Sequence, residues 1–189
     1  MKITFATGNP HKLQEIKEIA GDTKFEFVLP PEGFDPIENG TTFEENSLIK
    51  AREAARLSGM ISLADDSGLC VEALNGEPGI RSARYAETPQ KRIDKLLDAI
   101  KNSNNRKAKF VCAMTLVSPS GEILFQTRGE CNGEIARKQF GTNGFGYDPV
   151  FIVKDTNKTM AEMSENDKNL ISHRGKALRN ILKYLDKKF

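Results

Sequence analysis

Two adjacent carboxylates, Asp65 and Asp66, are well suited in type and spacing to hold a metal ion. They close an apolar segment and are followed by Ser67 and Gly68. A strand that ends in carboxylates can hold a hard cation such as Mg²⁺ at the edge of a sheet. Because side chains alternate along a strand, at most one of the two faces the site, and the other bonds to backbone or to a helix end. Glu38 lies in a proline-bearing loop where no local capping role explains it. Glu38 and one strand carboxylate therefore predict a magnesium site completed by water and phosphate.

A second candidate is the segment Thr7-Gly8-Asn9-Pro10-His11-Lys12, which follows the first apolar run. A strand that turns tightly into a helix presents free backbone N–H groups and the positive end of the helix to an anion. Lys12 lies one turn into the helix, from where it could reach back to a phosphate. The segment has neither the GxxxxGK[ST] nor the GxGxxG spacing. Phosphate binding and a plain strand-to-helix connection capped by Asn9 therefore both stay open.

Glycine and aromatic residues alternate in the segment Gly144-Phe145-Gly146-Tyr147-Asp148-Pro149. The glycines would let the backbone approach a ligand closely, and Phe145 offers a ring face on which a nucleobase can stack. The alternative is a glycine-rich loop whose Phe145 and Tyr147 fill the core.

Hydrogen-bond donors gather further along the chain, at Lys168, His173 and Arg174. A single histidine is usually structural. Next to Arg174 and near Lys168 in a helical region, it also fits a group of donors that contact a ligand, so both interpretations stay open.

The hydrophobic pattern predicts alternating strands and helices around these segments. Apolar runs predict strands over 2–6, 25–29, 60–65 and 150–153, an extended stretch over 69–74 and a hairpin over 109–129. Helical spacing and N-cap residues predict helices over 10–20, 42–58 and 88–100, and helical structure after residue 153 in which Ser164 caps the first segment. Thr42 and Glu45 form a capping box. The alternation favours an α/β fold with a mixed sheet.

Composition narrows the class of protein. A chain of 189 residues suits one large domain or two intimate lobes. Its three cysteines are scattered, which favours a reducing compartment, and the first residues do not form a signal peptide. The most apolar stretch, Phe110 to Val117, is too short to cross a bilayer. A formal charge of +2, three tyrosines and no tryptophan disfavour a nucleic-acid groove. We therefore predict a soluble, cytoplasmic protein that binds neither nucleic acid nor membrane.

Six segments carry a family resemblance, and they occur in one order along nearly the whole chain. They are Thr7-Gly8-Asn9 with Lys12, Thr42-Phe43-Glu44-Glu45-Asn46, Ala64-Asp65-Asp66-Ser67-Gly68-Leu69, Gly79-Ile80-Arg81-Ser82-Ala83-Arg84-Tyr85, Gly144-Phe145-Gly146-Tyr147-Asp148-Pro149 and Ser172-His173-Arg174-Gly175-Lys176-Ala177-Leu178. Each segment alone is a weak signal, but six in register are specific. The chain closely resembles the inosine triphosphate pyrophosphatase family, whose members act on deaminated purine nucleotides.

The resemblance implies an enzyme, a nucleoside triphosphate pyrophosphatase that uses Mg²⁺. It would hydrolyse ITP, dITP and XTP to the monophosphate and pyrophosphate, which keeps these nucleotides out of DNA and RNA. The implied fold is α/β, with a long mixed central sheet flanked by helices and two lobes with a cleft between them. The resemblance also implies a single domain over residues 1–189 and a homodimer.

The family's functional residues carry over onto matching positions of this sequence. Glu38 and Asp66 would be metal ligands, and Asp66 would also be the catalytic proton acceptor. The first loop would hold the triphosphate through Thr7, Gly8, Asn9, Pro10, His11 and Lys12. Ser67, which follows the two carboxylates, would contact the nucleotide. The base and sugar would be contacted by Phe145, Gly146, Tyr147, Asp148, Lys168, His173 and Arg174.

Physical chemistry modifies the role of Asp66. A carboxylate bound to Mg²⁺ is a poor base, because the cation lowers its proton affinity. We therefore expect Asp66 to accept a hydrogen bond from the water that attacks the α-phosphorus and to orient it, and Asp66→Asn to abolish turnover. Mg²⁺ and Lys12 would neutralise the departing pyrophosphate.

Base selection follows from hydrogen bonding. Donors from Arg174, His173 or backbone N–H groups would pair with the 6-oxo group of hypoxanthine and xanthine and would be left unpaired by the amino group of adenine. Guanine shares the 6-oxo group and must be excluded at its 2-amino group.

Three other functions are weighed against this one. A pyrophosphatase for other modified nucleotides, such as methylated pyrimidines, is disfavoured by the motifs around Phe145 and His173. A nucleotide sensor that does not cleave is disfavoured by Glu38 and Asp66, because a sensor has no need of a cleavage metal. A nucleic-acid binder comes last, because the charge is mild and aromatic residues are few.

Overall fold

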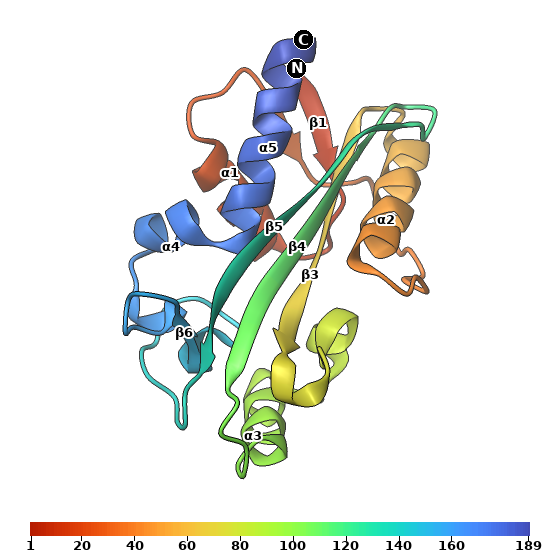
Figure 1. The fold of residues 1–189 in the computed structure, drawn as a ribbon. Coiled ribbons are helices and arrows are strands. Elements are labelled where there is room, and N and C mark those ends of the chain that lie inside the picture. The colour runs from red at the N-terminus through yellow and green to blue at the C-terminus, as the bar shows by residue number, and fades with distance from the viewer. The chain divides into compact units, whose positions relative to one another are not determined.

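The structure is a computed structural model that describes residues 1–189 apart from the side chain of His11. Its strands and helices alternate along the chain (Figure 1). The strands are β1 (Lys2–Phe5), β2 (Glu26–Val28), β3 (Ser62–Val71), β4 (Lys107–Val117), β5 (Ile123–Ile135) and β6 (Phe151–Val153). The α-helices are α1 (Pro10–Ala20), α2 (Phe43–Ser58), α3 (Pro89–Ala99), α4 (Glu165–Ile171) and α5 (His173–Lys188), and short 3-10 helices cover Glu72–Leu74, Gly79–Arg84, Asp148–Val150 and Met160–Glu162.

The strands form one sheet in the order β2-β1-β3-β4-β5-β6. β1 runs parallel to β2 and to β3, whereas β5 runs antiparallel to β6. The sheet is therefore mixed, and the predicted α/β fold with a mixed central sheet flanked by helices is confirmed. No helix within the described part of the chain is both long enough and apolar enough to cross a membrane.

The chain divides into two compact units. The first comprises Met1–Asp66, Cys112–Gly129 and Arg174–Phe189, and the second comprises Ser67–Val111 and Glu130–His173. Three strands, β3, β4 and β5, contribute residues to both units. The single domain expected over 1–189 stays a prediction.

In the first unit, helices pack on both faces of the sheet. One face buries residues of α1 and α5 against β1 and β3, including Ile3, Phe5 and Leu63. The other face buries the alanines of α2 against Ala6 and Ala64. Successive residues of β1 and β3 therefore point to different helices, as the alternation of side chains along a strand requires. Figure 1 shows α1 and α5 on one side of these strands and α2 on the other.

The second unit has a hydrophobic core of its own. It joins residues of β3, β4, β5, β6 and α3, and aromatic side chains lie at its centre. The rings of Phe110 and Phe151 are 4.5 Å apart between centroids and tilted, which is a favourable geometry for an aromatic pair.

The expected interruption of the strand at Asp65 and Asp66 is wrong. β3 runs without a break from Ser62 to Val71, so the carboxylates lie inside a strand. Its neighbour β1 ends instead: Phe5 pairs with Leu63, and Ala6 N–H still bonds to the Leu63 carbonyl at 2.7 Å. The carboxylates therefore lie just beyond the carboxyl end of a parallel neighbour, and the apolar pattern alone could not separate the two cases.

A second correction concerns the chain after residue 153. The segment expected to be helical throughout forms turns and a 3-10 helix up to Met163, and α4 begins only after the predicted N-cap, Ser164. Asp155 and Asn157 have positive φ angles of 65° and 55°, which a helix does not contain.

Candidate active site

Asp65 and Asp66 point to opposite faces of β3, as the sequence predicts. Asp65 lies on the face of Leu63 and contacts α1 and α5, whereas Asp66 lies on the face of Ala64 and contacts α2. Both carboxylates are buried. Two consecutive residues thus serve two different networks of the first unit.

Asp65 is held by two cations. Lys12 Nζ lies 3.1 Å and 3.2 Å from its two oxygens, and Arg174 donates to Oδ2 from Nε at 3.2 Å and from Nη2 at 3.0 Å. Arg174 also donates from Nη1 to Glu15 Oε2 at 2.6 Å. Burial alone would raise the pKa of Asp65, but Lys12 and Arg174 outweigh burial and hold that pKa far below its ordinary value. These side-chain cations are partners that the sequence analysis did not name for this carboxylate.

Asp66 belongs to a network with Asn46, Lys50 and Glu38. Its Oδ1 lies 3.2 Å from Lys50 Nζ, and its Oδ2 accepts from Asn46 Nδ2 at 3.3 Å. The same Lys50 ammonium lies 3.0 Å from Glu38 Oε2. Burial raises the pKa of Asp66, Lys50 opposes this, and the charges on Glu38 and Asp65 add to it, so the pKa lies above its usual value.

The residues fit a magnesium ion. Because Glu38 and Asp66 both contact one ammonium group, their oxygens are close enough to share one cation, and carboxylate oxygen is the ligand that Mg²⁺ prefers. Among the residues that the structure describes, no group of three His, Cys, Asp or Glu forms a larger ligand set. Two carboxylates with water and phosphate are an ordinary magnesium shell.

Helix α2 positions this network. Thr42 caps it by accepting from Glu45 N–H at 3.1 Å, as predicted. In a capping box the Glu45 carboxylate would accept from the N–H of the N-cap residue, Thr42. Here it accepts from the N–H of the preceding residue, Thr41, at 2.6 Å. Asn46 and Lys50 then lie one turn apart on the buried side of the helix.

Asn46 and Lys50 are functional candidates that the sequence analysis did not name as site residues. The two residues are four positions apart, on the helix face that also carries Ala51, Ala54 and Ala55. Polar residues at helical spacing within an otherwise small, apolar face were the available signal, because buried polar groups need partners.

The first loop leads from β1 directly into helix α1, and its predicted phosphate contacts stay a prediction. Pro10 opens α1, and the carbonyl of Asn9 accepts from the N–H groups of Lys12 and Leu13. Thr7 Oγ1 accepts from Asn9 N–H at 3.0 Å. At Gly8 an added Cβ would have nothing within 4 Å, so the loop is open on that side. The predicted contact through the side chain of His11 lies outside the described residues.

In the second unit, Phe145, Asp148 and Lys168 lie together. Lys168 Nζ donates to Asp148 Oδ2 at 2.7 Å and lies 4.7 Å from the centroid of the Phe145 ring. Phe145 N–H donates to the same Asp148 oxygen at 3.0 Å. At Gly144 an added Cβ would lie 2.1 Å from that oxygen, so the turn requires glycine there. Phe145 is 46% exposed, which leaves its ring available for stacking.

Tyr147 and His173 lie in the core of the second unit. The Tyr147 hydroxyl donates to the Ser82 carbonyl at 2.9 Å, and the His173 ring stacks on Phe110 at 4.8 Å between centroids. Ser67 is half-buried in β3. Of the two aromatic residues in the glycine-rich segment, Tyr147 therefore fills the core and Phe145 does not. Their predicted substrate contacts stay predictions.

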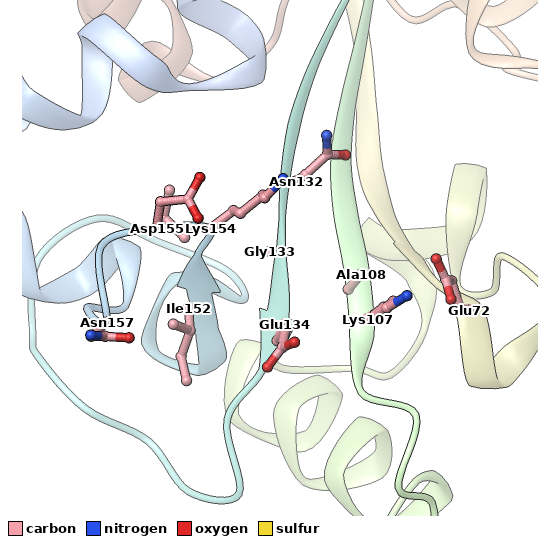
Figure 2. A pocket seen from close by; sticks show the side chains of 11 residues that line it. Glu72, Lys107, Ala108, Asn132, Gly133, Glu134, Ile152, Lys154, Asp155 and Asn157 are labelled. Atoms are coloured by element: carbon pink, nitrogen blue, oxygen red, sulfur yellow. The ribbon is translucent and has the colours of Figure 1, made fainter.

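The predicted site residues are divided between the two units. The first unit contains Thr7 to Lys12, Glu38, Asp66 and Arg174, and the second contains Ser67, Phe145 to Asp148, Lys168 and His173. A pocket of about 560 Å³ also lies in the second unit, lined by charged residues of both signs such as Lys107, Glu134 and Lys154 (Figure 2). None of the predicted site residues lines it within the part of the chain that the structure describes.

Comparisons with known proteins agree with the family resemblance. The chain matches the Ham1 family over residues 3–184. It is 42% identical over 177 residues to a dITP/XTP pyrophosphatase of Synechocystis sp., covering 94% of this chain and 91% of that protein. It is 46% identical over 188 residues to a dITP/XTP pyrophosphatase of Exiguobacterium sp., covering 96% and 95%.

Solved structures agree as well. The Staphylococcus aureus Ham1 protein superposes with a TM-score of 0.90 at 40% identity over 100% of both chains. A HAM1 protein from Coxiella burnetii gives a TM-score of 0.90 at 40% identity over 99% of both chains. The family expected from the six motifs is therefore confirmed, and the chain belongs to the Ham1 family.

Proposed function

We propose that this protein is a nucleoside triphosphate pyrophosphatase that hydrolyses dITP, ITP and XTP to the monophosphate and pyrophosphate. Relatives that are 42% and 46% identical over nearly the whole chain are dITP/XTP pyrophosphatases. The observation that carries the proposal is the pair of networks on β3. One network joins Lys12, which we propose to bind phosphate, to Asp65, and the other joins Glu38 and Asp66, which we propose as metal ligands, to Lys50.

Glu38 and Asp66 would hold the magnesium ion. When bound, Mg²⁺ neutralises phosphate charge and makes a nearby water more acidic. Within this chain, the backbone N–H groups at the start of α1 and the Lys12 ammonium would bind the triphosphate. Lys50 already pairs with both carboxylates and would supply a further positive charge near the reacting phosphate.

Asp66 would orient the attacking water. Its carboxylate has two fixed partners, Asn46 and Lys50, so its oxygens have set directions. As a hydrogen-bond acceptor it would align the water with the α-phosphorus, and cleavage there releases pyrophosphate.

Phe145 and Lys168 would contact the base. Phe145 offers an exposed ring for stacking, and Lys168, fixed by Asp148, offers a charged donor next to that ring. We also propose that His173 and Arg174 donate toward the 6-oxo group, which would favour hypoxanthine and xanthine over adenine. The family resemblance adds a homodimer, which light scattering of the purified protein tests directly.

The test is an assay that distinguishes pyrophosphate from orthophosphate, with Mg²⁺ and with ITP, dITP, XTP, ATP or GTP. Pyrophosphate from the first three, with ATP and GTP nearly untouched, is the expected result. Orthophosphate would place the attack at the γ-phosphorus and overturn the mechanism. No release from any of the five would favour a modified-pyrimidine substrate or a sensor.

A further inference from the structure

Asn46 connects the two carboxylates that we assign to the metal. Its side chain is fully buried, with 0% exposed. Its Nδ2 donates to Asp66 Oδ2 at 3.3 Å, and its Oδ1 accepts from the backbone N–H of Gly40 at 2.9 Å. Gly40 follows Glu38 by two residues in the same loop. One amide thus bonds to one proposed ligand directly and to the loop that carries the other.

The chemistry of this bridge requires an amide. The Gly40 N–H can only donate, and an ionised Asp66 can only accept, so the bridging side chain must offer an acceptor at one end and a donor at the other. A carboxylate at position 46 would repel Asp66, and an alkyl group would remove the bonds to the Gly40 N–H and to Asp66 Oδ2. Asparagine supplies both ends without adding charge to the site.

The loop is built to let this amide approach. A Cβ added at Gly40 would lie 2.7 Å from Asn46 Oδ1 and 2.7 Å from Glu45 Cβ, closer than a real Cβ approaches its neighbours. A larger residue at position 40 would therefore push the loop away from α2 and move Glu38 with it. Gly40 therefore lies in close contact with Glu45 and Asn46 of α2, which fixes the distance between the loop and the helix.

We propose that Asn46 is a positioning residue that sets the separation and orientation of Glu38 and Asp66 for the metal. The proposal rests on the proposed function, because it takes these two carboxylates as the magnesium ligands. In this role Asn46 would act through Glu38 and Asp66, and no contact with the nucleotide is needed. Its role is thus to reduce the cost of organising the site when the metal binds, as outer-shell partners of metal ligands commonly do.

Three variants test the proposal in the full-length protein. Asn46→Ala removes both bonds, and Gly40→Ala pushes on the bridge from the loop side while keeping the amide. Ser47→Ala is the matched control: Ser47 is the next residue of α2, is equally buried, and bonds to Thr115 Oγ1 at 2.6 Å and to the Glu44 carbonyl at 2.9 Å. Asn46→Ala and Ser47→Ala each remove the hydrogen bonds of one buried side chain of α2. Only Asn46 bonds to Asp66.

Two measurements report on the metal. One is the Mg²⁺ concentration for half-maximal dITP hydrolysis. The other is binding of Mn²⁺ alone to the nucleotide-free protein, followed by electron paramagnetic resonance into the millimolar range. We expect Asn46→Ala to raise the half-maximal Mg²⁺ concentration and the Kd for Mn²⁺ by about 10- to 100-fold. Gly40→Ala should raise both values as well, and Ser47→Ala should leave both at the wild-type values. At saturating Mg²⁺ the KM for dITP of Asn46→Ala should match the wild type.

The outcomes separate the two proposals. If the wild type releases pyrophosphate in a metal-dependent way but Asn46→Ala shows the same Mg²⁺ and Mn²⁺ dependence as Ser47→Ala, the positioning role is wrong and the proposed function stands. If Asn46→Ala does not fold, Gly40→Ala decides, and unchanged metal dependence in that variant overturns the positioning role. A wild type that neither needs nor binds a divalent metal overturns the metal site itself.

Discussion

Asp65 and Asp66 are consecutive residues of β3, and their pKa values are shifted in opposite directions. Both carboxylates are buried, so the difference comes from their partners. Lys12 and Arg174 stabilise the charged form of Asp65, whereas Asp66 has Lys50 on one side and the negative charges of Glu38 and Asp65 on the other. The strand therefore carries one carboxylate whose charged form is stabilised by two cations and one carboxylate whose charged form a further cation would stabilise.

The first prediction concerns Asp65→Asn. The change leaves the Arg174 guanidinium, which is only 2% exposed, without its charged partner on β3. Breaking a buried ion pair from one side costs about 3–5 kcal/mol, so we expect a loss of that order at pH 7 by urea unfolding. As a control, Asp98→Asn removes an exposed pair with Lys101, which should cost less than about 1 kcal/mol.

The pH dependence of the same variant has a definite sign. The folded-state pKa of Asp65 lies below the unfolded value of about 3.9, so its contribution to stability is complete above that pH and is lost as the pH falls toward the folded-state pKa. The gap in unfolding free energy between wild type and Asp65→Asn should therefore be constant from pH 7 to 5 and narrow below pH 4. A gap that widens on acidification would contradict the ion-pair assignment.

The second prediction concerns Lys50→Met. The variant removes the ammonium shared by Glu38 and Asp66, which leaves two carboxylates facing one another. Mg²⁺ can replace the missing charge, so its addition should raise the melting temperature of Lys50→Met more than that of the wild type. Binding to the folded state stabilises by about 1.4 kcal/mol when the metal is at ten times its Kd.

The control for this prediction is Lys109→Met. Lys109 pairs with Glu130 at a similar distance, 3.0 Å, in the second unit, away from the proposed ligands. Its melting temperature should respond to Mg²⁺ as the wild type does. Equal responses of Lys50→Met and Lys109→Met would show that Glu38 and Asp66 do not share a cation.

Local sequence signals predicted much of the fold and of the candidate site. Pro10, Thr42 and Ser164 begin helices where capping preferences place them, because these signals act over three or four residues. Alternation along the strand correctly predicted that Asp65 and Asp66 face opposite ways. These features depend on neighbours in sequence, which are visible without a structure.

Long-range pairing could not be predicted from the same signals. The contacts of Asp65 with Arg174 and of Asn46 with Asp66 depend on which helix covers which face of the sheet, and periodicity does not specify that choice. The uninterrupted run of β3 through Asp65 and Asp66 has a similar cause. Buried carboxylates are costly in a strand unless tertiary partners pair with them, and those partners come from α1, α2 and α5.

The third prediction concerns Phe145→Ala. Stacking of a base on an aromatic ring contributes about 1–3 kcal/mol, so we expect kcat/KM for dITP to fall about 5- to 150-fold. Phe140→Ala is a close control, because Phe140 is similarly exposed (41%) and has Lys138 Nζ 5.3 Å from its ring centroid, but it belongs to no predicted binding segment. A loss in Phe140→Ala as large as in Phe145→Ala would argue against base stacking on Phe145.

The fourth prediction concerns Arg174→Ala and separates two roles of the guanidinium. The ion pairs with Asp65 and Glu15 make Arg174 an anchor of the first unit, and its loss should destabilise the protein whichever substrate is used. If Arg174 also donates to the 6-oxo group, kcat/KM must fall more for ITP than for ATP, because adenine offers no acceptor there. We expect this larger loss on ITP. Glu15→Gln is the control: it weakens the anchor without removing a donor, so it should lower stability and leave the ratio of ITP to ATP unchanged. Equal losses on the two nucleotides in Arg174→Ala would confine Arg174 to the anchoring role and leave base selection to His173, Lys168 and backbone donors.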